Sequence, residues 1–132
     1  MSHFTKIDRA NIVDVNAFIS ACKELGLTDV KQNIQIKDFY GQMMKVDVAI
    51  KCGRYDIALK KNQAGTYDMV ADWWGCRGSH QKFQGLTDSD IQDLILKHTT
   101  KNTIVNRYKK MGFRASVTED ANQDLQIELV RY

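Results

Sequence analysis

The sequence predicts an α+β fold in which two helices pack on one face of an antiparallel sheet, in the order β-α-β-β-β-β-α-β-β. Two segments repeat apolar residues three and four positions apart, as on one helical face, and the remaining segments alternate apolar with polar residues, as in half-buried strands. The gaps between alternating segments are short and contain Gly or Asn, which favours hairpins over crossovers. At 132 residues and 43% hydrophobic content, we expect a single α+β domain over residues 1–132.

A short first strand is expected at Phe4–Ile7, followed by the first helix. Asp14 stands where an N-cap belongs, and Gly26 is placed to end the helix in a left-handed conformation. The residues that share one helical face between these two are Val15, Phe18, Ile19, Cys22 and Leu25.

Four further strands are expected in the middle of the chain, because hydropathy alternates there with a period of two. The alternating residues are Ile34 and Ile36; Met44, Val46, Val48 and Ile50; Tyr55, Ile57 and Leu59; and Tyr67 and Met69. An antiparallel meander is the simplest way to connect these four strands.

The second helix has a clear start. Thr87 is the expected N-cap, and Asp88 and Asp90 place negative charge on the first turn, where free N–H groups stabilise it. The apolar stripe continues to the end of the helix near Gly112, but the polar stretch His98–Thr103 interrupts it. The pattern therefore leaves a bend or a break open in this stretch.

The chain is expected to close with a hairpin of strands Phe113–Val117 and Leu125–Leu129, joined by a turn at Glu119–Asp124. A hairpin at this place leaves a strand edge whose backbone groups a second copy of the chain could cover. A homo-oligomer is therefore among the expected states.

Charge, termini and cysteine content exclude several classes of protein. The formal net charge of +3 is far below that of a dedicated nucleic-acid-binding protein, so sequence-specific nucleic-acid recognition is not expected. Met1–Phe4 lacks the features of a secretory signal, and no apolar run is long enough to span a bilayer. Three widely spaced cysteines do not suit a disulfide framework. We expect a cytoplasmic protein without membrane contacts.

The segment from Trp73 to Gly85 shows no period and concentrates side chains suited to ligand binding. Adjacent residues of an extended segment point in opposite directions, so Trp73 and Trp74 cannot both face one core. An exposed tryptophan beside Arg77 and His80 could stack on a base or another aromatic ligand. Burial of the second tryptophan under a helix or a dimer mate is the alternative.

Cys76 and His80 also stand at a spacing seen in halves of zinc sites. A structural zinc ion needs four ligands, and no second close pair accompanies these two, so we expect no metal. Cys76 could serve as a thiolate nucleophile with His80 as its base, but a small buried thiol explains the cysteine equally well. No cofactor-binding motif is present, and no cofactor is expected.

The second helix carries the clearest charge signal, because no acidic residue occurs from Leu94 to Thr118. The basic residues in this stretch are Lys97, Lys101, Arg107, Lys109, Lys110 and Arg114. Such a run could bind a small anionic ligand, and four of its members (Lys97, Lys101, Arg107 and Lys110) join Trp73, Trp74, Arg77 and His80 as candidate ligand-binding residues. The alternative is that these cations stabilise the C-terminal end of the helix dipole in solvent.

Several short motifs resemble those of the uncharacterised hypothetical chloroplast reading frame thirty-five family, a plastid and cyanobacterial domain of unknown function. They are Met1–Phe4, Tyr55–Ile57, Tyr67–Asp72, Met111–Phe113 and Ile127–Tyr132, in the same order along nearly the whole chain. The segment Leu96–Thr100 departs from the aromatic-rich helix expected of this family, as in a divergent or phage-borne member. The resemblance implies a small protein of the cytoplasm or plastid stroma and supplies no catalytic residues.

We therefore expect a non-enzymatic accessory or binding protein whose partner is another protein. The alternative is a binder of a small anionic ligand, such as a nucleotide, through the Trp-Trp loop and the basic second helix. A hydrolase or transferase that uses Cys76 and His80 is the third possibility.

Overall fold

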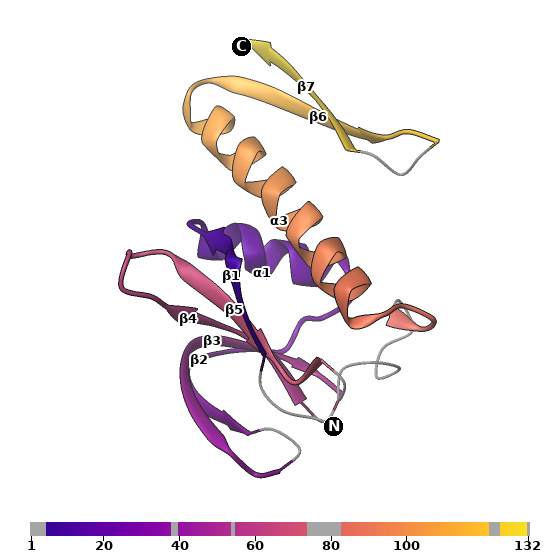
Figure 1. Cartoon of the computed structure of the whole chain (residues 1–132). Helices are drawn as coiled ribbons and strands as arrows, with labels where there is room; N and C mark the ends of the chain where they lie inside the picture. Colours follow the sequence, from indigo (N-terminus) through magenta and orange to yellow (C-terminus); the bar gives the residue numbers. More distant parts are fainter. Residues whose placement is uncertain (1–4, 38–39, 54, 74–82, 122–124, 132) are drawn as a thin grey trace.

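The computed structural model describes residues 5–37, 40–53, 55–73, 83–121 and 125–131, with side chains from Ile12 onward (Figure 1). Within these residues the elements follow the predicted order and confirm the α+β class. The elements are β1 (Thr5–Ile12), α1 (Val15–Glu24), β2 (Val30–Lys37), β3 (Met43–Cys52), β4 (Tyr55–Lys61), β5 (Tyr67–Ala71), α3 (Asp88–Lys110), β6 (Phe113–Glu119) and β7 (Leu125–Arg131).

Five strands form one antiparallel sheet in the order β1-β5-β4-β3-β2. Strands β2 to β5 are neighbours in chain order, which confirms the predicted meander, and β1 returns to pair with β5. β1 extends to Ile12 instead of ending at Ile7. Its register against β5 shifts between Ile7 and Ile12, and an irregularity of this kind disrupts the period of two from which a strand is predicted.

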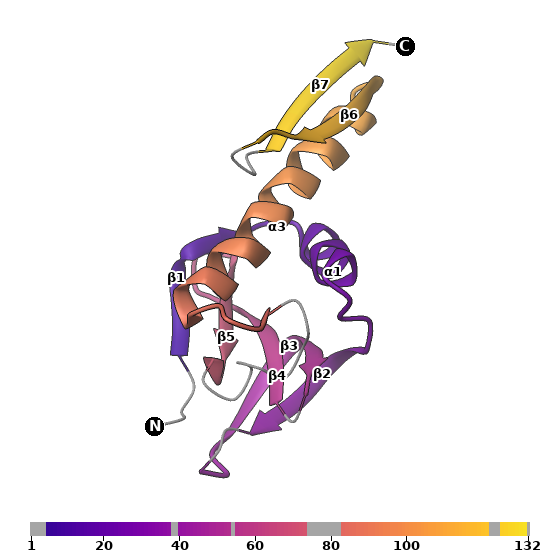
Figure 2. The same ribbon diagram turned by 90° about the vertical axis from the view of Figure 1, so that its right-hand side faces the viewer.

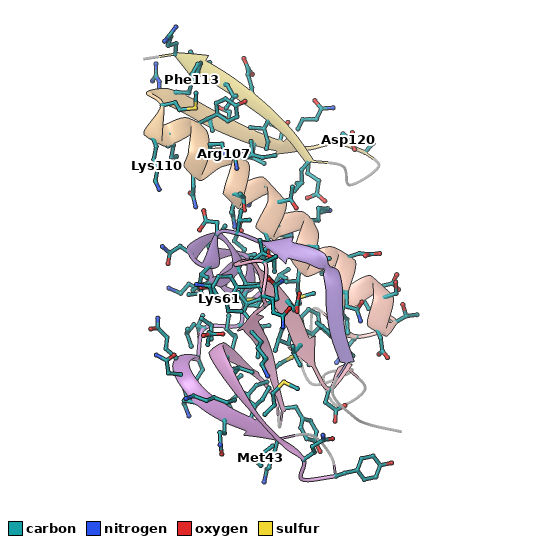
Figure 3. The ribbon with its side chains drawn as sticks, turned by 60° about the vertical axis from the view of Figure 1, so that its left-hand side comes forward. Met43, Lys61, Arg107, Lys110, Phe113 and Asp120 are labelled. Atoms are coloured by element: carbon teal, nitrogen blue, oxygen red, sulfur yellow. The ribbon has the colours of Figure 1, made fainter. Side chains whose placement is uncertain are left out.

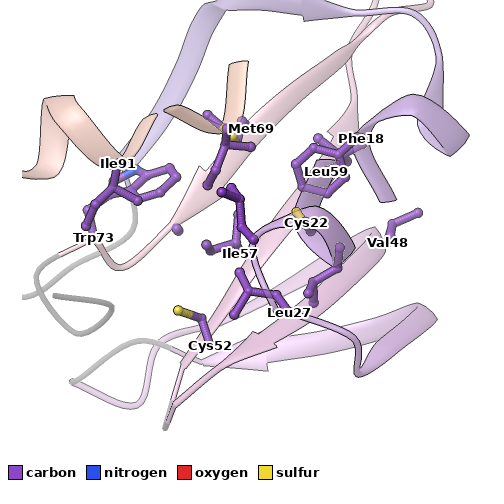
Figure 4. Close-up of a cluster of buried hydrophobic side chains, with 14 of the residues drawn as sticks. Phe18, Cys22, Leu27, Val48, Cys52, Ile57, Leu59, Met69, Trp73 and Ile91 are labelled. Atoms are coloured by element: carbon purple, nitrogen blue, oxygen red, sulfur yellow. The ribbon is translucent and has the colours of Figure 1, made fainter. Parts of the chain in front are cut away.

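Both helices lie on the same side of the sheet (Figure 2), and the main core fills the space between the helices and the strands (Figure 4). α1 contributes Phe18 and Cys22, and α3 contributes Ile91 and Ile95, each at 0% exposure. The strand residues that meet them alternate along the sheet: Val48, Ile50, Cys52, Ile57, Leu59, Met69 and Ala71. A second, smaller cluster lies on β2, β3 and β4, where Ile36 and Val46 group with Ala49 and Ala58.

The predicted helix starts are confirmed. The Asp14 carboxylate accepts a hydrogen bond from the Ala17 N–H at 3.0 Å. Thr87 and Asp90 form a reciprocal capping box, in which each side chain accepts a hydrogen bond from the backbone N–H of the other residue.

α3 does not break at His98–Thr103, because it runs as one helix from Asp88 to Lys110. The hydroxyls of Thr99 and Thr103 donate to the carbonyls of Ile95 and Thr99, each at 2.8 Å, and so remain satisfied within the helix. Other polar side chains of this stretch face α1, as described below. The interruption of the apolar stripe is therefore a polar contact between helices.

The closing hairpin also forms, but as a two-stranded sheet of its own rather than as part of the main sheet. It packs on α3, where the rings of Tyr108 and Phe113 meet edge to face with centroids 5.7 Å apart. The guanidinium of Arg131 lies 5.5 Å from the Phe113 ring centroid on the same hairpin.

Candidate functional site

The last part of α3 and the hairpin β6–β7 project from the body of the molecule (Figures 1 and 2). Thr99 is the last buried residue of α3, and none of the described residues from 100 to 131 is buried. We call residues 100–131 the arm. A two-stranded hairpin that packs on one helix buries little surface, so an arm whose described residues are all at least partly exposed is well suited to contact another molecule.

Large apolar side chains are exposed along the arm. They are Ile104 at 36% exposure, Met111 at 59%, Val117 at 40% and Val130 at 45%. Val13, at the junction of β1 and α1, is 59% exposed and lies beside the arm, where it lines cavities together with Thr103 and Arg107. Apolar side chains gathered on one projecting element are typical of a protein interaction surface.

A polar cluster attaches the base of the arm to α1. The Glu24 carboxylate of α1 accepts hydrogen bonds from the Lys101 ammonium and, at 2.7 Å, from the Asn102 amide. His98 Nδ1 lies 3.7 Å from the same carboxylate, and the Asn102 amide also reaches the Ala17 carbonyl at 3.3 Å. One acidic side chain thus binds Lys101 and Asn102 of α3 and lies close to His98.

Ionisation of this cluster is shifted by its surroundings. Burial opposes the charge on Glu24, but hydrogen bonds from Lys101 and Asn102 and the positive charge of Lys101 outweigh burial and lower the pKa of Glu24. Burial lowers the pKa of His98, and the charges of Lys101 and Lys97 act in the same direction, against Glu24. The cluster therefore favours ionised Glu24 and neutral His98.

We expect acid to destabilise the protein through this cluster. Both groups have a lower pKa in the folded chain, so the unfolded chain binds more protons as the pH falls below the ordinary values of 6.5 for His98 and 4.5 for Glu24. Urea unfolding at pH 7.5, 5.5 and 4.0 measures the effect. The free energy of unfolding should fall less between pH 7.5 and 5.5 in His98→Gln than in the unaltered chain. An equal loss in both would show that His98 does not contribute.

Two of the candidate ligand-binding lysines are thus paired with carboxylates. Lys101 belongs to the Glu24 cluster, and its side chain is only 12% exposed. Lys97 Nζ lies 3.8 Å from the Glu119 carboxylate of β6, and both of these side chains are more exposed, at 33% and 54%. Lys101 holds the arm to α1, and Lys97 links α3 to the hairpin.

Arg107 and Lys110 line a groove of about 340 Å³ near the end of α3, and Figure 3 shows both on this part of the helix. The remaining lining residues are Val13, Asp14, Thr103, Asn106 and Met111. The Asn106 amide donates to the Asp14 carboxylate at 3.3 Å. Within the described part of the chain, Arg107, Lys109 and Lys110 form no ion pair with a carboxylate. We call these three residues the basic end of the arm.

A larger groove of about 540 Å³ runs between α3 and β7. Leu96 and Ile104 of α3 face Leu125 and Ile127 of the hairpin across it, and the polar lining residues are Asp93, Lys97, Thr100 and Lys101. A smaller groove of about 150 Å³ lies between α3 and Ile12 and Val13. The hairpin therefore leaves part of the apolar surface of α3 open.

Trp73 is a core residue, and its burial leaves no exposed ring face of the kind expected for stacking on a ligand. It is 2% exposed, because it continues the inward-facing series of Met69 and Ala71 on β5. Trp74, Arg77 and His80 lie outside the described residues, as does Cys76. Of the eight candidates, the structure therefore describes Trp73 and the four of α3, of which Lys97 and Lys101 line one groove and Arg107 and Lys110 another.

The other two cysteines are unsuited to nucleophilic chemistry. Cys22 and Cys52 are free and buried. Burial, with a smaller contribution from nearby Cys52, raises the pKa of Cys22 to about 12, so its thiol stays protonated at neutral pH. Both side chains serve as small apolar groups of the core.

Glu24 and the grooves on either side of α3, of about 540 and 150 Å³, are not among the features predicted from the sequence. Glu24 is the only acidic residue of α1, a signal that could have marked it as the partner of the basic helix. The larger groove depends on how the hairpin meets α3, and the smaller one on how α3 packs beside Ile12 and Val13. Hydropathy patterns encode neither arrangement.

Comparison with known families gave one result. A family model described as "Protein of unknown function (DUF1257)" matches residues 21–130, from within α1 to within β7. The searches of curated proteins and of solved structures gave no match. None of the helices in the described residues is long and apolar enough to cross a membrane.

Proposed function

The chain belongs to the DUF1257 family of proteins of unknown function, and from the geometry of the arm we propose that it is a non-enzymatic accessory protein that binds an acidic partner protein. The partner contacts the basic end of the arm and the apolar side chains beside it. The body of the molecule, with its five-stranded sheet, α1 and the first part of α3, supports the arm.

The observation that carries this proposal is that basic side chains without an ion pair among the described residues lie beside exposed apolar side chains. Arg107 and Lys110 share a groove with Val13 and Met111, each of which is 59% exposed. Arg and Met are enriched at protein interfaces, and apolar surface adds affinity that a small inorganic anion cannot use. The free charges of the basic end select an acidic surface and accelerate its encounter.

We propose further that the protein is a divergent relative of the hypothetical chloroplast reading frame thirty-five proteins and acts in the cytoplasm or plastid stroma. Support comes from the quoted motifs, of which Met1–Phe4 and Tyr67–Asp72 are the most specific. A partner in such a compartment would be a protein of the same cell or of a phage that infects it.

Poly-L-glutamate of about 20 residues, labelled with a fluorophore, is the probe for this proposal. We expect it to bind the unaltered chain, and to bind Lys109→Gln/Lys110→Gln about tenfold more weakly, since each lost charge contact contributes roughly 0.5–1 kcal/mol. Added salt should weaken the binding, because exposed charges are screened. Fluorescence anisotropy measures each dissociation constant.

The matched control is Lys60→Gln/Lys61→Gln, which removes two adjacent exposed lysines of β4 and changes the net charge equally. An equal loss of affinity in both double variants would mean that overall charge, and not the arm, attracts the probe. Displacement of the probe by ATP at equal charge concentration would overturn the choice of an acidic protein over a small anion.

A further inference from the structure

One face of α3 forms an open ridge between the larger groove, of about 540 Å³, and the smaller groove, of about 150 Å³. Leu96, Thr100 and Ile104 line both grooves. Of these two grooves, Asp93 lines only the larger and Arg107 only the smaller. These five residues lie within one narrow arc of a helix with 3.6 residues per turn and span about 21 Å of its axis. We call them the stripe. Asp93, Thr100, Ile104 and Arg107 are exposed and Leu96 is half-buried.

The stripe is complementary to itself when its direction is reversed. Asp93 stands seven residues before Thr100 and Arg107 seven residues after it, while Leu96 and Ile104 stand four residues before and after. In two antiparallel helices related by a two-fold axis at Thr100, Asp93 of each copy therefore faces Arg107 of the other. Leu96 faces Ile104 in the same way, and the two threonines meet on the axis.

We propose that the stripe is a self-association surface, through which two copies of this chain pair antiparallel by their α3 helices. An interface of this type uses the same patch on both subunits, as most homodimers do. The ridge of one helix enters the grooves beside the other, which is how packed helices interdigitate. Thr100, a small residue, stands at the crossing and allows close approach.

The walls of the two grooves explain why a second copy fits better than an unrelated helix. Leu125 and Ile127 of the hairpin stand on one side of the stripe, and Ile12 and Val13 stand on the other. Both copies of the chain have these four apolar side chains beside the stripe. The exposed apolar side chains of one copy are therefore covered by those of the other copy. The dimer covers Arg107 and Val13, so the acidic partner of a dimer contacts Lys109, Lys110 and Met111 at the end of each arm.

A charge-swap experiment tests the proposal. Asp93→Lys sets Lys against Arg107 of the second copy, and Arg107→Glu sets Glu against Asp93, so each variant alone should associate at least about tenfold more weakly. A 1:1 mixture of the two variants restores both opposite-charge contacts in a heterodimer. The double variant Asp93→Lys/Arg107→Glu should again form a homodimer.

Sedimentation velocity between about 1 and 200 µM measures these assemblies. Thr100→Arg, which places two like charges on the axis, should also be monomeric and does not depend on local contacts of Asp93. Asp29→Lys, an exposed change on the body, should associate like the unaltered chain. An unaltered chain that stays monomeric over this range, or single variants that fail to associate when mixed, would overturn the proposal.

Discussion

Replacing Phe18 with alanine is expected to lower the free energy of unfolding by about 3–5 kcal/mol, the usual cost of truncating a fully buried phenylalanine. The Phe18 ring is 0% exposed and joins α1 to the sheet in the main core (Figure 4). Its loss leaves a cavity that neighbouring side chains fill only in part. Since a small domain has a total stability of only about 5–15 kcal/mol, the variant should be partly unfolded at 37 °C.

Phe113→Ala is the matched control, because it makes the same change on the arm. Phe113 is only half-buried and contacts Tyr108 and Arg131, so its truncation should cost about 1 kcal/mol. Urea unfolding measures the difference, and hydrogen exchange locates it: amides of β6 should exchange faster while those of β4 do not. An equal loss of stability in both variants would show that the arm and the body share one core.

The sequence predicts those elements of this fold that are determined by interactions between residues close along the chain. Asp14 and Thr87 cap their helices through local hydrogen bonds, and both helix starts lie where these residues place them. The meander follows from alternating hydropathy and short gaps, which only neighbouring antiparallel strands satisfy. Local information was sufficient wherever the element and its partners are close along the chain.

Contacts between distant segments were not predictable in the same way. The stretch His98–Thr103 suggested a break because its polar residues had no visible partner, yet Glu24, more than 70 residues earlier, accepts from Lys101 and Asn102. The hairpin was predicted correctly as a hairpin, but its alternation of apolar and polar residues does not indicate whether it joins the main sheet. Both answers depend on how α3 crosses α1.

The candidate site, too, depends on contacts between distant segments that the sequence does not show. A basic run predicts charge on a helix surface, but cannot show which charges are neutralised by another element. Lys101 and Lys97 are paired, whereas Arg107 and Lys110 form no ion pair with a carboxylate within the described residues. The burial of Trp73 was predictable, because its place two residues after Ala71 assigns it to the inward face that continues from β5.

Replacing Lys101 with methionine is expected to cost about 1–2 kcal/mol of unfolding free energy, in buffer that contains no ligand. Methionine keeps the length of the apolar stem but removes the ammonium that donates to Glu24, and hydrogen bonds to charged groups contribute about 1.5–3 kcal/mol when buried. Glu24 is 36% exposed, so water replaces part of the loss. Such an effect without ligand would identify Lys101 as a residue that holds the arm to α1.

Lys97→Met supplies the control one turn earlier on the same helix. Its partner Glu119 is 3.8 Å away and 54% exposed, and exposed ion pairs contribute about 0–1 kcal/mol, so this variant should lose markedly less stability. A double-mutant cycle with Glu24→Gln then isolates the pair, because Lys101→Met should cost much less when Glu24 has already lost its charge. If Lys101→Met cost the same in both backgrounds, the lysine would stabilise α3 by packing alone, and the attachment of the arm would rest on Asn102.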